Sequence, residues 1–137
     1  MERTVEIRAS VIDDIVAHAR DDAPLECCGL LLGSGTRVEA AHRARNTLLS
    51  PTRYAVEPED HFAALRAART AGLSVVGAYH SHPRSPAVPS PTDLAEASYP
   101  DFIWLIVGVQ GEGGQPEVRA FRLEPGNFHP LPLVTFS

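Results

Sequence analysis

Two histidines separated by one residue, His80 and His82, end a short apolar run, and Asp93 follows after a proline-rich loop. Side chains at positions i and i+2 of a strand point to the same face, so the two imidazoles should project together. A divalent metal can bridge two imidazoles held side by side. Zinc binds neutral imidazole nitrogen and carboxylate oxygen, and a catalytic zinc site has three protein ligands and one open position for water. His80, His82 and Asp93 are therefore candidate ligands of a catalytic zinc.

The loop between the histidines and the aspartate should be stiff, because each proline fixes one backbone angle. Its prolines are Pro83, Pro86, Pro89 and Pro91. Ser90, Pro91 and Asp93 also have the N-cap, N1 and N3 spacing with which ordinary helices begin. An H-x-H pair alone is common among strand histidines, so the pair and the cap are each weak signals. The two interpretations are compatible, since a helix cap would orient Asp93.

Taken as one string, His80-x-His82-Pro83 followed by Ser90-x-x-Asp93 resembles the signature of the JAMM (MPN-type) zinc metallopeptidases. That family hydrolyses isopeptide or peptide bonds after ubiquitin or ubiquitin-like proteins. The resemblance implies one zinc per chain, held by His80, His82 and Asp93. It also implies that Ser90 donates a hydrogen bond to the tetrahedral oxyanion.

Glu26 is the second part of the resemblance. The family carries a glutamate shortly before a Cys-Gly pair and an apolar strand, and uses it as general acid and base. Glu26, followed by Cys28 and Gly29, matches that pattern, although on composition alone it is an ordinary loop glutamate. The resemblance implies that Cys28 is a packed residue and not a ligand. Asn46 matches a frequent family asparagine and is expected to have a structural role.

Composition excludes several classes of protein. With 137 residues, one domain over 1–137 is expected. The net charge of −5 argues against a nucleic-acid partner, because proteins that bind nucleic acids usually carry a basic surface. The longest apolar run, residues 102–109, is too short to cross a bilayer, so no membrane partner is expected. The N-terminus does not resemble a signal or transit peptide, and adjacent Cys27 and Cys28 are unsuited to a framework disulfide, which favours the cytoplasm.

Hydrophobic periodicity predicts the elements that must position these side chains. Helices are expected from Ser10, as N-cap, to Pro24, over residues 58–71, and over 91–98. Strands are expected over residues 3–8, 28–32, 36–45, 53–56, 73–79, 102–109, 118–123 and 128–134. His18 is expected on the solvated face of the first helix. Phe62, Leu65 and Ala68 are expected to face inward from the second.

The resemblance implies an α/β (α+β) fold: a single domain with a curved mixed sheet flanked by helices, the cytidine-deaminase-like MPN/JAMM fold. The chain lacks room for the inserted segments with which eukaryotic relatives grip ubiquitin chains. It is most similar to the small stand-alone prokaryotic members. These imply cleavage after the C-terminal Gly-Gly of a ubiquitin-like protein, often a sulfur carrier. The apolar segment 128–136 could pair subunits into a homodimer.

Other metal sites fit the sequence less well. Zinc deaminases combine H-x-E with P-C-x-x-C, and zincins need H-E-x-x-H on a helix. A barrel with H-x-H on a strand needs about 250 residues, and a cupin would need further histidine and glutamate ligands. The alternative from a different class is a non-catalytic MPN scaffold that binds partners. Such a scaffold would purify without stoichiometric zinc.

Overall fold

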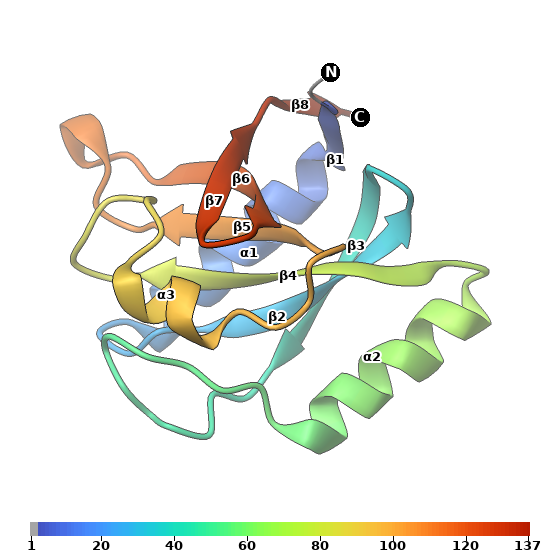
Figure 1. The fold of residues 1–137 in the computed structure, drawn as a ribbon, viewed down its shortest axis with the longest axis horizontal. Coiled ribbons are helices and arrows are strands. Elements are labelled where there is room, and N and C mark those ends of the chain that lie inside the picture. The colour runs from blue at the N-terminus through green and yellow to red at the C-terminus, as the bar shows by residue number, and fades with distance from the viewer. Residues whose placement is uncertain (1–2) are drawn as a thin grey trace.

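The computed structural model describes residues 3–137, which form a mixed α+β fold around one eight-stranded sheet (Figure 1). The predicted fold class is thereby confirmed. The elements are β1 Val5–Arg8, α1 Ala9–Asp22, β2 Cys28–Ser34, β3 Arg37–Ala44, α2 Pro58–Thr70, β4 Ser74–His82, α3 Pro91–Glu96, β5 Ile103–Gly108, a short 3-10 helix Glu112–Gly114, β6 Glu117–Glu124, β7 Asn127–Leu131 and β8 Leu133–Phe136.

The sheet has the order β7-β6-β5-β4-β2-β3-β1-β8. The pairs β4/β5, β1/β3 and β1/β8 are parallel, and the other neighbours are antiparallel. β7 and β8 therefore lie at opposite ends of the order although only Pro132 separates them in sequence. The sheet must curl strongly for its two ends to be joined in this way, and Figure 1 shows β7 and β8 close together.

The prediction of one strand over residues 128–134 was wrong. Pro132 has no N–H with which to continue the ladder to β6. Its carbonyl oxygen instead accepts a hydrogen bond from the Val5 N–H at 2.8 Å, and β8 then pairs with β1. Pairing of subunits through this segment stays a prediction.

The two long helices cover opposite faces of the sheet (Figure 1). Val11 and Ile15 of α1 pack in one cluster with Tyr79 of β4, while Ala64 and Ala68 of α2 pack in a second cluster with Ala78. β4 thus sends alternate side chains into two cores, which places His80 on the same side as Ala78. Every residue of β5 is buried, as predicted for a central strand.

The predicted start of the first helix was wrong. α1 begins at Ala9 with Arg8 in the N-cap position, and no side chain caps it. Ser10 lies inside the first turn. The chain passes directly from β1 into the helix, so β1 fixes the helix start without a capping side chain.

His18 was wrongly predicted to be solvated, because it is only 4 % exposed. Its Nδ1 lies 2.7 Å from the Tyr79 hydroxyl, and its Nε2 lies 3.3 Å from Asp22. A Cβ at Gly29 would overlap the Tyr79 ring, so this glycine leaves the space that the ring occupies. The charged residues near His18 in the sequence suggested an exposed position, but this side of α1 packs against β4.

The predicted inward face of α2 was only partly right. Ala68 is buried as predicted, together with Ala64, but Phe62 and Leu65 are 59 % and 43 % exposed. Two alanines allow the helix to lie close to the sheet, and this contact turns the larger apolar side chains outward. The helix start is well specified, since the Glu57 side chain accepts hydrogen bonds from two N–H groups of the first turn.

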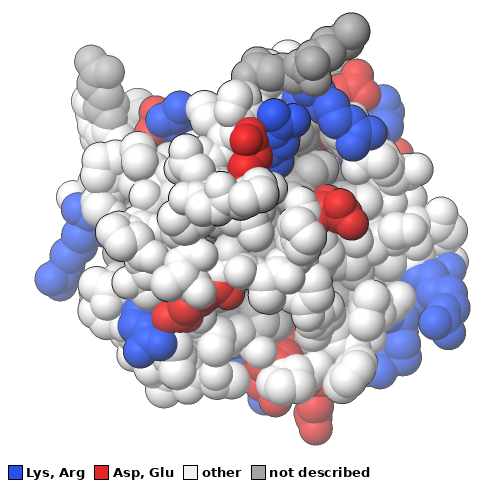
Figure 2. Space-filling view, viewed as in Figure 1, with Lys and Arg blue, Asp and Glu red and all other residues white. Residues whose placement is uncertain are grey.

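No helix among residues 3–137 combines the length and the apolar composition needed to cross a membrane. In the orientation of Figure 1, charged side chains lie mainly around the rim of the visible face, and its centre is largely uncharged (Figure 2).

Candidate metal centre

β4 continues through His82 and brings both histidines to the end of the sheet. His80 lies beside Cys28 of β2 and Ile106 of β5, so neighbouring strands enclose it on both sides. The Nε2 atoms of His80 and His82 are 3.2 Å apart, and both residues are buried. The i and i+2 alternation therefore places the two imidazoles on one face, as the sequence predicted.

Asp93 reaches the same point from the first turn of α3. Ser90 and Asp93 form a reciprocal capping box: the Asp93 N–H donates to Ser90 Oγ at 3.0 Å, and the Ser90 N–H donates to Asp93 Oδ2 at 2.9 Å. The carboxylate lies 3.2 Å from His80 Nε2 and 3.0 Å from His82 Nε2. All three potential ligand atoms fall within 4.8 Å of one another.

Contacts with neighbouring groups hold both histidine rings in place at the candidate metal centre. His82 Nδ1 lies 2.8 Å from the Pro86 carbonyl oxygen. Because a carbonyl can only accept, Nδ1 carries the proton and the Nε2 lone pair faces the centre. His80 stacks on Tyr54 with ring centroids 4.5 Å apart. Burial lowers the pKa of His80 although Asp93 acts in the opposite direction, which favours the neutral ligand form. The donor set therefore fits zinc.

Glu26 stands in the loop before β2 and is 3 % exposed. Its Oε1 atom has no hydrogen-bond partner among the described residues. Burial raises the pKa of Glu26 to about 8, and the nearby His82 charge only partly opposes this effect. A buried carboxyl group with a pKa close to neutrality can both accept and release a proton. Glu26 therefore has the properties of a general acid and base.

In metal-free protein, Glu26→Gln is expected to stabilise the fold increasingly as the pH rises. The native pKa of Glu26 is about 8, against 4.5 for an unperturbed glutamate. The native state holds this proton more tightly than the unfolded state, so wild-type stability should fall as the pH rises between these values. We expect the variant to gain on the order of 2 kcal/mol in the free energy of unfolding at high pH. Urea unfolding across this pH range measures the gain, and a pH-independent difference would contradict it.

Asn46 connects Glu26 to the following loop. Its Nδ2 donates to the carbonyl oxygens of Glu26 at 3.1 Å and Arg53 at 3.0 Å. Its Oδ1 accepts from the N–H groups of Leu48 at 3.0 Å and Ala55 at 3.1 Å. The side chain thus uses all four of its hydrogen-bonding positions on the backbone. This supports the structural role expected for Asn46, which connects the backbone of Glu26 to the loop over residues 48–55.

Replacing Asn46 by Ala should lower turnover by about 10- to 100-fold, because a displacement of about 1 Å at a reacting group has an effect of that size. The variant should lose about 2 kcal/mol of stability, since buried backbone carbonyls would lose their donor. Zinc content should not change, because Asn46 contacts none of the three ligands. Kinetics together with metal analysis test this, with Asn127→Ala at the exposed first residue of β7 as the matched control. Loss of zinc in Asn46→Ala would contradict the assignment.

Sequence reasoning missed Tyr54 and the Pro86 carbonyl, which contact His80 and His82, respectively. Tyr54 was expected in a short strand, but that segment makes only an isolated bridge between Asn46 and Val56. No spacing signal links Tyr54 to His80, because their contact arises from a loop folding back over β4. The carbonyl of Pro86 carries no side-chain signal at all.

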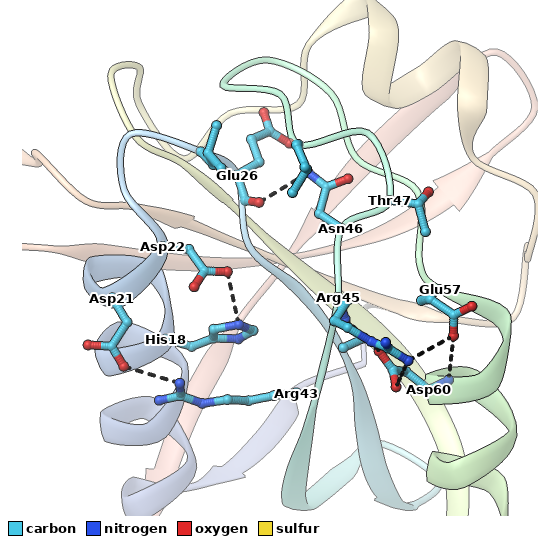
Figure 3. A pocket seen from close by; sticks show the side chains of 13 residues that line it. His18, Asp21, Asp22, Glu26, Arg43, Arg45, Asn46, Thr47, Glu57 and Asp60 are labelled. Atoms are coloured by element: carbon cyan, nitrogen blue, oxygen red, sulfur yellow. Dashed lines mark hydrogen bonds and ion pairs between the residues drawn. The ribbon is translucent and has the colours of Figure 1, made fainter.

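Two cavities flank the candidate metal centre. One, of about 900 Å³, extends between α1, β3 and α2 and is lined at one end by Glu26 and Asn46 (Figure 3). Its walls carry the ion pair of Arg43 with Asp21 and the contact of His18 with Asp22 (Figure 3). The other, of about 280 Å³, is lined by Asp93 and a group of aromatic side chains. Among the residues that the structure describes, none lines both cavities.

The mixed sheet carries at its end a His-His-Asp group that could hold a metal ion. Residues 8–124 match the family described as prokaryotic homologs of the JAB domain (Prok-JAB). The chain belongs to this family, and the predicted resemblance is confirmed.

Relatives that carry names agree with this family assignment. The chain is 40 % identical to the desampylase of Haloferax volcanii over 112 residues, which cover 77 % of this chain and 81 % of that protein. It is 35 % identical to the CysO-cysteine peptidase of Mycobacterium tuberculosis over 122 residues, covering 88 % and 83 % of the two chains. It is 38 % identical to a probable TtuB-protein conjugate cleaving protease of Thermus thermophilus over 117 residues, covering 85 % and 74 %.

Solved structures show the same fold. A solution structure of a Desulfitobacterium hafniense protein matches with a TM-score of 0.84 at 27 % identity, covering 97 % of this chain and 93 % of that one. A solution structure of a Salinibacter ruber protein matches with a TM-score of 0.74 at 38 % identity, covering 97 % and 92 %.

Proposed function

We propose that this protein is a zinc-dependent peptidase that hydrolyses the bond after the C-terminal Gly-Gly of a ubiquitin-like carrier protein. The convergence of two imidazole nitrogens and one carboxylate at the end of β4 carries the proposal. The names of the relatives, which include a CysO-cysteine peptidase and a probable TtuB-protein conjugate cleaving protease, support hydrolysis of such a bond. The partner is thus a small ubiquitin-like sulfur carrier, either as a protein conjugate or with a single amino acid attached.

In this proposal His80, His82 and Asp93 hold one zinc ion. When bound, the zinc supplies a water molecule of lowered pKa and polarises the scissile carbonyl. The protein's own part is to keep His80 neutral by burial and to orient the His82 ring through the Pro86 carbonyl. The capping box holds the Asp93 carboxylate through the Ser90 N–H.

Glu26 is the proposed general base and acid. Its raised pKa allows it to take a proton from the attacking water and to pass that proton to the leaving amine. Ser90 is the proposed oxyanion donor. Because Ser90 Oγ accepts from the Asp93 N–H, its own hydroxyl proton is free to be donated to the oxyanion.

Ser90→Ala should reduce kcat by less than about 100-fold, the lower bound for losing one oxyanion donor, if zinc holds most of the developing charge. The same change removes a helix cap, which lowers stability by about 1 kcal/mol. Ser90→Thr is the conservative control, because threonine restores both the hydroxyl donor and the cap. Single-turnover rates and thermal unfolding should therefore recover together in Ser90→Thr. A loss above about 1,000-fold in Ser90→Ala would mean that Ser90, and not zinc, bears most of that charge.

The proposed function is tested with a carrier protein joined through its C-terminal Gly-Gly to cysteine or to a lysine side chain. Mass spectrometry of the products should show a carrier that ends in intact Gly-Gly, formed by zinc-loaded protein and not by chelator-treated protein. Both linkages should be offered, so that the preferred leaving amine is identified. A chain that purifies without zinc and leaves both conjugates uncut would be a non-catalytic MPN scaffold.

A further inference from the structure

Three buried side-chain polar atoms lack a hydrogen-bond partner within residues 3–137: Glu26 Oε1, His80 Nδ1 and Trp104 Nε1. The first two belong to the candidate metal centre. Trp104 lies on β5 and is 6 % exposed, so its indole N–H is a buried donor with no acceptor. Folded proteins satisfy nearly all such donors. The unpaired N–H therefore points to an acceptor that a bound molecule supplies.

Trp104 lines the 280 Å³ cavity that also reaches Asp93. We call this cavity the Asp93-side pocket. Its other walls combine aromatic and apolar side chains, among them Tyr54, Tyr99 and Phe102, with polar ones that include the paired Arg53 and Glu96. The pocket thus offers apolar surface and one unpaired donor, and it ends beside a candidate zinc ligand. Its volume lies just below the usual range of small-molecule sites, which suits one side chain with its main chain and not a folded domain.

The two cavities beside the metal centre indicate on which side each half of the substrate binds. The general acid must stand next to the leaving amine, and Glu26 lines the larger cavity. The leaving group therefore belongs on that side. Asp93 lines the opposite pocket, which shares no residue with the first. The acyl part of the substrate, which ends in Gly-Gly, is left to occupy the Asp93-side pocket.

We propose that the Asp93-side pocket binds an apolar side chain immediately before the Gly-Gly of the carrier, and that Trp104 Nε1 donates to a main-chain carbonyl of the same tail. This inference rests on the proposed function. An extended chain advances about 3.3 Å per residue, so two glycines place the first side chain about 7 Å from the scissile carbonyl. The glycines pass the metal centre without side chains, and the next residue is the first that can fill the pocket.

The surface beyond the pocket fits this path. An adjoining cavity of about 510 Å³ shares Tyr99 and Phe102 with the pocket and continues to Phe62 and Leu65 of α2. These two outward-facing side chains contradicted the predicted packing of the helix. A tail that leaves the pocket in this direction would meet a continuous apolar strip.

Binding can be measured without catalysis, because Trp104 is the only tryptophan in the chain. Metal-free wild-type protein is titrated with acetyl-Leu-Gly-Gly-amide and with acetyl-Ser-Gly-Gly-amide while tryptophan emission is recorded. The leucine peptide should shift the emission and bind roughly 10- to 100-fold more tightly, as burial of one apolar side chain predicts. Equal affinities, or no saturable change up to about 10 mM peptide, would overturn the proposal.

Two variants test the pocket with a matched control. Tyr99 and Val134 are both 48 % exposed, but only Tyr99 lines the pocket. Tyr99→Ala should weaken the leucine peptide about 10-fold, and Val134→Ala should leave its affinity unchanged. Trp104→Phe, followed by calorimetry, should weaken it about 5-fold through loss of one hydrogen bond. Equal effects of Tyr99→Ala and Val134→Ala would place the peptide elsewhere.

The outcome is independent of the hydrolytic test. If the leucine peptide binds selectively while zinc-loaded protein cuts no Gly-Gly conjugate, the pocket stands and the proposed function fails. If the conjugate is cut but the two peptides bind alike, the proposed function stands and the pocket assignment fails.

Discussion

Glu26→Gln is expected to lower kcat/KM for a Gly-Gly-linked conjugate by roughly 1,000-fold, within the range of general acid–base catalysis, and to leave one zinc per chain. Glutamine preserves the shape of the side chain but cannot exchange a proton at neutral pH. The change should disturb little else, since Glu26 Oε1 contacts no hydrogen-bond partner among residues 3–137. Steady-state kinetics together with metal analysis of the same sample measure both quantities.

The matched control for this variant is Glu59→Gln, which changes a side chain that is 86 % exposed on α2. This control should have wild-type kcat/KM and zinc content. Full activity in Glu26→Gln would exclude Glu26 as the base. Loss of zinc from Glu26→Gln would make this glutamate a ligand, and the proposed division of roles would be wrong.

His82→Ala is expected to weaken zinc binding by at least about 1,000-fold and to abolish turnover. Loss of a residue that only supports a ligand weakens metal binding about 10- to 100-fold, so loss of a ligand should have a larger effect. Competition with a chelator of known affinity measures the change. Thermal unfolding gives a second measure, because bound zinc raises wild-type stability by RT ln(1 + [Zn]/Kd) and should no longer do so in the variant.

His42→Ala is the matched control for the ligand variant. His42 lies on β3, which β2 separates from the strand that carries His82. Its removal should leave zinc affinity and turnover at wild-type values. Stoichiometric zinc in His82→Ala, or equal loss in both variants, would show that the metal lies elsewhere.

The convergence of His80, His82 and Asp93 could be predicted because it depends on local rules. Strand alternation places His80 and His82 on one face, and the helix cap at Ser90 orients Asp93 toward them. The central strand could also be predicted, since a continuous apolar run of that length is buried on both faces. The role proposed for Glu26 came from the family resemblance. Its burial and its missing partner became visible only in the structure.

The features that could not be predicted depend on contacts between distant parts of the chain. His18 is buried because Tyr79 approaches it from β4. Phe62 and Leu65 face outward because small alanines set the packing distance of α2. The split of the last strand depends on the sheet curling until its two ends are joined through Pro132, and no local pattern encodes that closure.

The unpaired polar atoms at the site lower the stability of the fold, and each lies on a residue with a proposed function. Natural proteins keep unsatisfied buried groups mainly where function requires them. Here the three such atoms lie on Glu26, His80 and Trp104, the residues assigned to proton transfer, metal binding and substrate binding. The expected gain in stability of Glu26→Gln at high pH is one measurable consequence of this balance.

The central claim is that zinc binds between β4 and α3 beside Glu26. Anomalous diffraction at the zinc absorption edge, from crystals of zinc-loaded Glu26→Gln, tests it most directly. We predict one peak per chain, about 2.0–2.2 Å from His80 Nε2, His82 Nε2 and an oxygen of Asp93. A zinc-loaded crystal with no peak at these three residues, or with its peak at another site, would contradict the claim.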